Sequence, residues 1–294
     1  RSPEGAKATG ISTYQEAVAA TRINNDYWMK HRTGACKLLN VLQGENHADA
    51  DDWYEQMKDY CDPNVYPDKH FNGWSMGGQN MCDVHLVLKR IVALRFDGLL
   101  EQGKHDFMHF LGTSKLEWAT LLTDIQRAVR KYHNPNFTIT FDCASPFLAT
   151  ANGQIYIQTE TEDRTKWVYR MVPSIDELKY ATDTRNFRDG VLADGIFKNF
   201  SNSPLTENIK VNDVCIYAPG DTNKVGGPKI LAGEIDRDKH GNPILDEDGN
   251  QIIRKRDSTS WDSFSYAIQM GHNVWSHINA VQEANRQYDN GNVP

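Results

Sequence analysis

Asp142 is the residue of this sequence best placed to do covalent chemistry. It directly follows Phe137, Ile139 and Phe141, whose spacing of two is typical of a β-strand. In sheets flanked by helices, ligands bind beyond the carboxyl ends of the strands, because the loops of that edge converge on one mouth. Asp142 is therefore a candidate nucleophile or general base. The alternative is an aspartate that only caps the turn after the strand.

Three earlier segments end in a similar way, with an amide or glycines after a short apolar run. The runs are 36–42, which leads into Gln43-Gly44, 73–76, which leads into Gly77-Gly78, and 107–111, in which Leu111 precedes Gly112. A single glycine at a strand end usually serves a turn. Four such ends that together offer an amide, backbone N–H groups and a carboxylate favour a binding site.

Helical patterns separate these four strands. Thr13 and Glu16 have the spacing of a capping box before a first helix that ends near His31, and Ser114 and Glu117 have it before a fourth. Four cycles of helix and strand predict an α/β fold with a parallel sheet and right-handed crossovers. The spacing suits half of an eight-stranded barrel. We therefore expect residues 1–153 to be a βα barrel portion that carries the active site.

The chain changes character after Gly153. Residues 154–172 alternate as a hairpin would, and residues 219–258 are rich in Gly, Pro, Asn and Asp. We expect a β-rich insertion over 154–262 and a C-terminal helix over 263–294. The segment Asp246-Glu-Asp-Gly lacks the ligand spacing of a calcium loop, so we assign a turn to it rather than a metal.

The bulk composition is that of a folded protein with an acidic surface. The 294 residues are 39 % apolar and carry a net charge of −7, which excludes a globally basic nucleic-acid coat. The five cysteines are widely spaced and form no Cys-x-x-Cys pair, which argues against a disulfide framework and a zinc cluster. No apolar run approaches membrane length. These features predict a cytoplasmic protein, in the host cytoplasm if the source is viral, with no membrane partner.

Taken together, the strand ends resemble the tRNA-guanine transglycosylase family, the queuine and archaeosine tRNA-ribosyltransferases. The resemblance rests on Leu-Asn-Val-Leu-Gln43-Gly44, Trp-Ser-Met-Gly77-Gly78, His-Phe-Leu111-Gly112-Thr-Ser-Lys115 and Phe141-Asp142-Cys143, in that order and spacing. It covers about residues 14–150, with weaker similarity at 270–273, and the series of four is more specific than any single motif. It implies a (β/α)8 TIM-type barrel, whose C-terminal half lies in this chain, and an enzyme that exchanges guanine for a 7-deazaguanine.

The resemblance also implies a role for each strand end. Asp142 would attack the sugar C1′ and form a covalent glycosyl-enzyme. The Gln43 amide and the Gly78 N–H would bind the base, Gly77 would allow its close approach, and Leu111 would pack against its ring. The residue types suit this chemistry, since a carboxylate can form and release a glycosyl ester and a purine edge needs paired donors and acceptors. No cofactor is expected.

Three features depart from the family pattern. The family's general base and the aspartate that reads the exocyclic amine belong to the first half of the barrel, which we expect to precede Arg1 or to come from a second polypeptide. The family's three zinc-binding cysteines are absent before His272, so no metal is predicted, and His272 and His277 are expected to be packing or surface histidines. The stretch 144–153 after the nucleophile carries no charge, whereas the tRNA enzymes have an arginine-bearing loop there.

The uncharged stretch favours DNA as the polymer, with tRNA as the alternative. The first choice is therefore the DNA-modifying branch of the family, found in phages and bacterial modification clusters, which inserts 7-deazaguanines such as preQ0. The free base is a second partner, and a homodimer is compatible with the resemblance. Local basic groups would have to hold the strand. The candidates are Arg164, Lys166, Arg170, Arg254, Lys255 and Arg256.

Two other functional classes remain open. A non-catalytic partner subunit of such an enzyme would keep the barrel and lose the nucleophile, whereas Asp142 is present. A glycoside hydrolase would need a second carboxylate across the sugar from Asp142, and none of the other three strand ends supplies one.

Overall fold

The computed structural model forms two compact units, Arg1–Cys143 and Ala144–Pro294. The residues that the structure describes are 7–163, 167–175, 180, 183–189, 203–214, 240, 242–243, 245, 248–251 and 264–292. The division after Cys143 differs from the expected boundaries at 153 and 262. The residues expected to form a β-rich insertion lie largely outside the described ranges.

The first unit contains a parallel sheet of four strands in sequential order. The strands are β1 (Asn40–Leu42), β2 (Gly73–Met76), β3 (Phe107–Phe110) and β4 (Thr138–Phe141). The prediction of four parallel strands is confirmed, although β1 is shorter than the run 36–42. The register aligns Leu42, Met76, Phe110 and Phe141 in one row across the sheet. Consecutive strands are therefore neighbours throughout.

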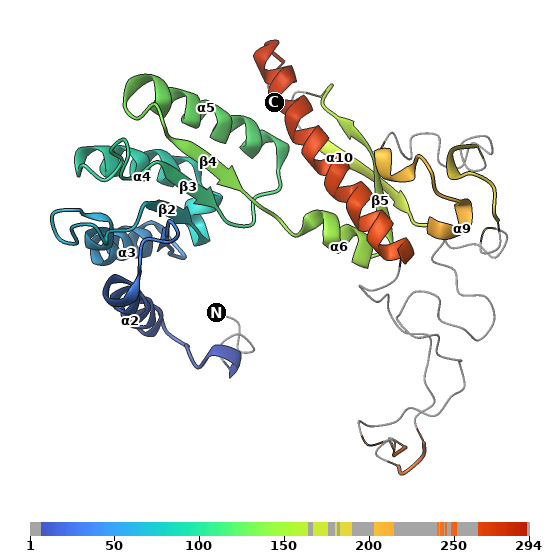
Figure 1. Ribbon diagram of the computed structural model, residues 1–294, viewed down its shortest axis with the longest axis horizontal. Helices are drawn as coiled ribbons and strands as arrows, with labels where there is room; N and C mark the ends of the chain where they lie inside the picture. Colours follow the sequence, from blue (N-terminus) through green and yellow to red (C-terminus); the bar gives the residue numbers. More distant parts are fainter. Residues whose placement is uncertain are drawn as a thin grey trace. The chain divides into compact units, whose positions relative to one another are not determined.

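Helices alternate with these strands, as Figure 1 shows. They are α2 (Tyr14–His31), α3 (His47–Met57), α4 (Val84–Phe96) and α5 (Leu116–Tyr132), with the short 3₁₀ helices η1 (Lys58–Cys61) and η2 (Gly78–Met81). The capping box at Thr13 is confirmed, because its side chain accepts from the Glu16 N–H and Glu16 reaches back to the Thr13 N–H. The N-cap expected at Ser114 lies one residue further along the chain. Helix α5 begins at Leu116 with Lys115 at its N-cap.

The sheet has one buried apolar face and one polar face. Trp74, Met76, Met108 and Phe110 are almost fully buried in the core that they form with apolar side chains of α3, α4 and α5. Side chains alternate along a strand, so the intervening residues Val41, Ser75, His109 and Thr140 share the opposite face, and the register aligns them in a second row. The core that the sheet forms with α3, α4 and α5 thus lies on one of its two faces.

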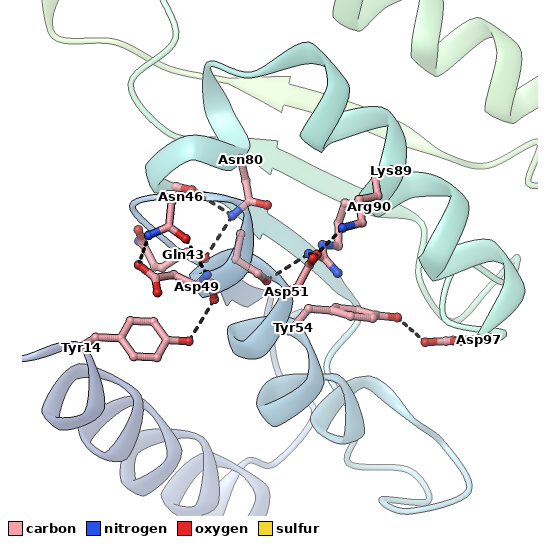
Figure 2. A network of polar contacts seen from close by, with 12 residues as sticks. Tyr14, Gln43, Asn46, Asp49, Asp51, Tyr54, Asn80, Lys89, Arg90 and Asp97 are labelled. Atoms are coloured by element: carbon pink, nitrogen blue, oxygen red, sulfur yellow. Dashed lines mark hydrogen bonds and ion pairs between the residues drawn. The ribbon is translucent and has the colours of Figure 1, made fainter.

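A buried arginine joins α3 to α4. Arg90 is 2 % exposed, and its Nη2 donates to the Ala50 carbonyl at 3.0 Å and to Asp51 Oδ1 at 2.9 Å (Figure 2). Its guanidinium carbon lies 4.3 Å from the centre of the Tyr54 ring, and the Tyr54 hydroxyl donates to Asp97 at 2.8 Å. Burial raises the pKa of Asp51, but hydrogen bonds and charge from Lys89 and Arg90 outweigh it and hold that pKa below its usual range. Asp51 therefore stays ionised as the partner of a buried cation.

Each outer edge of the sheet is capped by one side chain. At the β1 edge, the Trp53 indole N–H donates to the Val41 carbonyl at 2.9 Å. At the β4 edge, the Ile139 N–H donates to the Gln126 side-chain oxygen at 2.7 Å. Edge groups left without partners invite pairing with other chains. These two contacts protect one backbone group on each side.

The second unit is built on a long helix. It contains α6 (Ser145–Ala151), β5 (Gln154–Glu160), β6 (Val168–Pro173), η3 (Pro204–Thr206), α9 (Val211–Val214) and α10 (Phe264–Asp289). Strands β5 and β6 pair antiparallel, which confirms the expected hairpin. Asn273 of α10 is fully buried, accepts from the Tyr156 N–H at 2.9 Å, and donates to Thr150 at 2.9 Å and to the Gln154 carbonyl at 3.0 Å. The C-terminal helix is therefore part of the core of this unit.

This unit also contains a short helix after Asp142 and a bridge around the turn expected at Asp246. The uncharged stretch 144–153 contains the helix α6, and Pro146 in its first turn suits a helix start. Leu245 and Gln251 form an antiparallel bridge around the expected turn. No helix within the described ranges is long and apolar enough to cross a membrane.

We predict that Arg90 contributes far more to stability than its neighbour Lys89, although both contact Asp51. Arg90→Ala should lower the free energy of unfolding by about 3 kcal/mol, because it leaves the Ala50 carbonyl and Oδ1 of Asp51 without their shared donor. Lys89→Ala should cost less than about 1 kcal/mol, because that pair is exposed. Urea unfolding at neutral pH measures both losses. Equal losses would show that buried Arg90 does not hold α3 to α4 more strongly than exposed Lys89 does.

Candidate active site

Four of the five residues singled out in the sequence form one row at the carboxyl edge of the sheet, and Gly78 follows directly after Gly77. Gln43, Gly77, Leu111 and Asp142 each directly follow a member of the aligned row that ends the four strands. By alternation they lie on the side of the polar face, two positions beyond Val41, Ser75, His109 and Thr140. The structure therefore brings all four strand ends together on the side of the sheet opposite the buried core.

The first two strand ends are packed so closely that only glycine fits. A Cβ atom on Gly77 would lie 2.5 Å from Nε2 of Gln43, so the Gln43 amide rests directly on the Gly77 backbone. Gly78 has a φ of +56°, and a Cβ there would lie 2.4 Å from the Gly44 carbonyl oxygen. The Gln79 N–H donates to that oxygen at 2.9 Å. The Gly78 N–H has no hydrogen-bond partner within the described part of the chain.

Asn80 is a site residue that the sequence analysis missed. It is fully buried, and its Nδ2 donates to the carbonyls of Gln43 and Gly77, both at 3.2 Å (Figure 2). The amide thus locks the first strand end to the second. An asparagine soon after paired glycines is common in turns, so the sequence offered no signal that this one is buried.

Asp142 is held by one of its two oxygens. Oδ1 lies 3.1 Å from Nε2 of His109 and 3.3 Å from the Gly112 nitrogen, whose N–H donates to it. The Asp142 side chain is 66 % exposed and that of His109 is 24 % exposed. The carboxylate is therefore open to a ligand. Leu111 is half-buried beside it, and its N–H donates to the Met76 carbonyl at 3.0 Å.

His109 is a second residue that the sequence analysis missed. Its Nδ1 lies 2.8 Å from the Thr140 hydroxyl, so Thr140, His109 and Asp142 form a polar chain across β3 and β4. A weak signal was present in the sequence. His109 and Thr140 each lie between two apolar residues of a strand, at the position that alternation assigns to the polar face.

A cleft of about 800 Å³ lies between α2 and β1 and reaches the first two strand ends. Its walls include the aromatic rings of Tyr14, Trp28 and Trp53, and Gln43 and Gly78 also line it. Aromatic walls with a few polar groups are typical of sites for flat organic ligands. The amide and the free N–H at its end could form hydrogen bonds with the edge of such a ligand.

The described residues contain no group of three His, Cys, Asp or Glu side chains that could hold a metal ion. His272 is buried in the second unit, and its Nε2 lies 2.7 Å from the Tyr156 carbonyl. His277 is also buried and stacks on Tyr169, with ring centres 5.0 Å apart. Burial lowers the pKa of both histidines. Both are therefore packing residues.

The row of strand ends combines an exposed carboxylate, a backbone N–H free to donate and a side-chain amide that can donate and accept. Such a set can bind the polar edge of a heterocycle and attack an electrophilic carbon next to it. The chain matches no protein-family model, no curated protein and no solved structure.

We predict that Gly78 is needed for its small size as well as for its backbone conformation. Gly98 is the matched control, because its φ is +72° but a Cβ there would meet nothing within 4 Å. Gly98→Ala should cost about 1 kcal/mol from the left-handed backbone alone. Gly78→Ala should cost at least about 3 kcal/mol, because its Cβ also presses on the Gly44 backbone. Equal shifts of the urea midpoint would show that the close approach is not rigid.

Proposed function

We propose that this protein is a guanine transglycosylase of the DNA-modifying branch of the tRNA-guanine transglycosylase family. It would exchange guanine in DNA for a 7-deazaguanine base such as preQ0 through a covalent aspartyl-glycosyl intermediate. The observation that carries the proposal is the alignment of Gln43, Gly77, Leu111 and Asp142 in one row at the carboxyl edge of a parallel sheet. These are the positions at which the sequence resembles the family.

The order of the strands in the sheet supports a (β/α)8 barrel fold. Strands that neighbour one another in sequential order, joined through helices, are what half of a (β/α)8 barrel contains. A doubly wound sheet would instead reverse its strand order at a switch point. We propose that the four strands are the C-terminal half of such a barrel. The polar face would then line its interior, and the general base would come from the other half.

The proposed reaction assigns one task to each strand end. Asp142 forms a bond to the sugar C1′, the bond from C1′ to the guanine nitrogen breaks with its electron pair going to the base, and the base takes a proton from water. The incoming base then reverses these steps. The Gln43 amide and the Gly78 N–H bind the base edge, and Leu111 packs against its ring. A site whose donors pair with one base edge discriminates strongly between that base and others, because a wrong base leaves buried polar groups unpaired.

The choice of polymer rests on the charge of the residues that follow the nucleophile in the sequence. The stretch 144–153 carries no charge, and a net charge of −7 confines any grip on phosphates to local basic groups. Arg170 lies in the described hairpin and pairs with Glu160 at 2.7 Å, so it would have to exchange that carboxylate for a phosphate. The other five candidate basic residues lie outside the described ranges. DNA is the proposed polymer and tRNA the alternative.

The nucleophile assignment predicts that Asp142→Asn abolishes base exchange in a folded protein. Exchange should fall at least about a thousandfold, because an amide cannot form the glycosyl ester. Unfolding free energy should change by less than about 1 kcal/mol, because the side chain is largely exposed. The matched control is Asp59→Asn, an exposed aspartate of η1. Near-normal exchange by Asp142→Asn would remove Asp142 from its proposed role.

The polymer assignment predicts that a labelled 7-deazaguanine enters DNA. The full-length protein is incubated with the labelled base and with guanine-containing single-stranded DNA, duplex DNA or tRNA. Incorporation should be faster into single-stranded than into duplex DNA, because extruding a paired base costs a few kcal/mol. An oligonucleotide with adenine in place of every guanine is the control. Label that enters tRNA but never DNA would overturn the DNA assignment and leave base exchange standing.

A further inference from the structure

The polar chain from Thr140 through His109 to Asp142 joins the side chains of β3 and β4. Those two strands are already paired over four residues by their backbones. A hydrogen bond to a carboxylate whose side chain is 66 % exposed adds little to stability. The three side chains also lie on the polar face, outside the buried core. A purely structural role therefore leaves their alignment unexplained.

Hydrogen-bond chemistry determines the direction of each contact in this chain. A carboxylate can only accept, so the contact of 3.1 Å requires a proton on Nε2 of His109. In a neutral ring Nδ1 is then an acceptor, and the Thr140 hydroxyl, 2.8 Å away, donates to it. A hydroxyl can also accept, so Thr140 remains a partner if the ring becomes protonated. Thr140 thus fixes the ring orientation in either charge state.

Both donors reach the same oxygen of Asp142. The His109 ring and the Gly112 N–H engage Oδ1, and Oδ2 has no hydrogen-bond partner among the described residues. Two donors on one oxygen fix the rotation of the carboxylate. They leave the lone pairs of Oδ2 free for an electrophile at the open side of the row.

We propose that His109 is a positioning residue, which holds Asp142 with Oδ1 engaged and Oδ2 presented to the sugar C1′. This inference rests on the proposed function. In the first step Oδ2 becomes the ester oxygen and Oδ1 the ester carbonyl, which still accepts from both donors. In the return step the ester bond breaks and its electron pair restores the carboxylate, which accepts these hydrogen bonds more strongly than the ester does. His109 transfers no proton in either step.

The kinetic test compares two substitutions of the same ring. His109→Leu removes the donor at similar size and should lower kcat for base exchange by about 10- to 100-fold, because a misaligned nucleophile loses its attack geometry. KM for the free base should stay within about twofold of the original, because the base contacts lie at Gln43 and Gly78. His109→Gln keeps an N–H donor and should restore most of the loss. His85→Leu, an exposed histidine of α4, is the matched control and should change neither constant.

Thr140 supplies a second series. Thr140→Val keeps the shape of the side chain but removes the hydroxyl that orients the His109 ring. It should lower the rate at which the covalent protein–DNA adduct forms, by less than His109→Leu does. Thr140→Ser should restore the rate. Adduct formation is followed by chemical quench with guanine-containing DNA and no incoming base, which isolates the first step. A valine variant as fast as the wild type would remove Thr140 from the proposal.

A readout that needs no activity keeps the proposal decidable if a variant folds poorly. Nitrogen NMR of the histidine side chains should show His109 as the Nε2–H tautomer, and Asp142→Asn should shift its signals. A different tautomer, or signals unmoved by Asp142→Asn, would overturn the positioning role. Unchanged kcat in a folded His109→Leu would overturn it too, while base exchange stood. A wild-type protein that forms no adduct with DNA or tRNA would overturn the proposed function and this inference with it.

Discussion

The in-register pairing of four parallel strands is the constraint on which the rest of the first unit depends. The register aligns Leu42, Met76, Phe110 and Phe141, and the residues that follow them become one row of strand ends. A slip of one residue in β3 would turn Met108 and Phe110 out of the core and expose two fully buried side chains, at a cost of about 3 to 6 kcal/mol. The apolar face under the helices therefore stabilises the alignment of the polar groups on the opposite side.

Buried polar groups then fix the parts that apolar packing leaves adjustable. Arg90 ties α3 to α4 through a backbone carbonyl and a carboxylate, and Asn80 ties two strand ends through their carbonyls. Asn273 does the same in the second unit for α6 and β5. Each of these side chains is almost fully buried, where an unpaired polar group is costly. They favour one arrangement over neighbouring ones that would bury similar apolar area.

Asp142 has the opposite character. Its side chain is largely exposed, only one of its oxygens is engaged, and its hydrogen bond with His109 adds little to stability. A carboxylate so placed can change its bonding without loss of the fold. The first unit thus combines a closely packed frame, made by Gly77, Gly78 and Asn80, with an exposed carboxylate. The covalent chemistry that we propose needs such a combination.

The sequence by itself determined the local elements, because their signals lie within a few residues of one another. Alternation at Phe137, Ile139 and Phe141 marked β4, the capping spacing at Thr13 marked α2, and the glycines marked where strands end. Only the tertiary structure decided which groups meet. His109 contacts a carboxylate 33 residues away, and Asn273 accepts from a backbone N–H 117 residues away. The start of α5 and the presence of α6 also escaped local reasoning, since short helices depend on packing for most of their stability. Periodicity places a side chain on a face, but a contact across strands depends on register, which long-range burial sets.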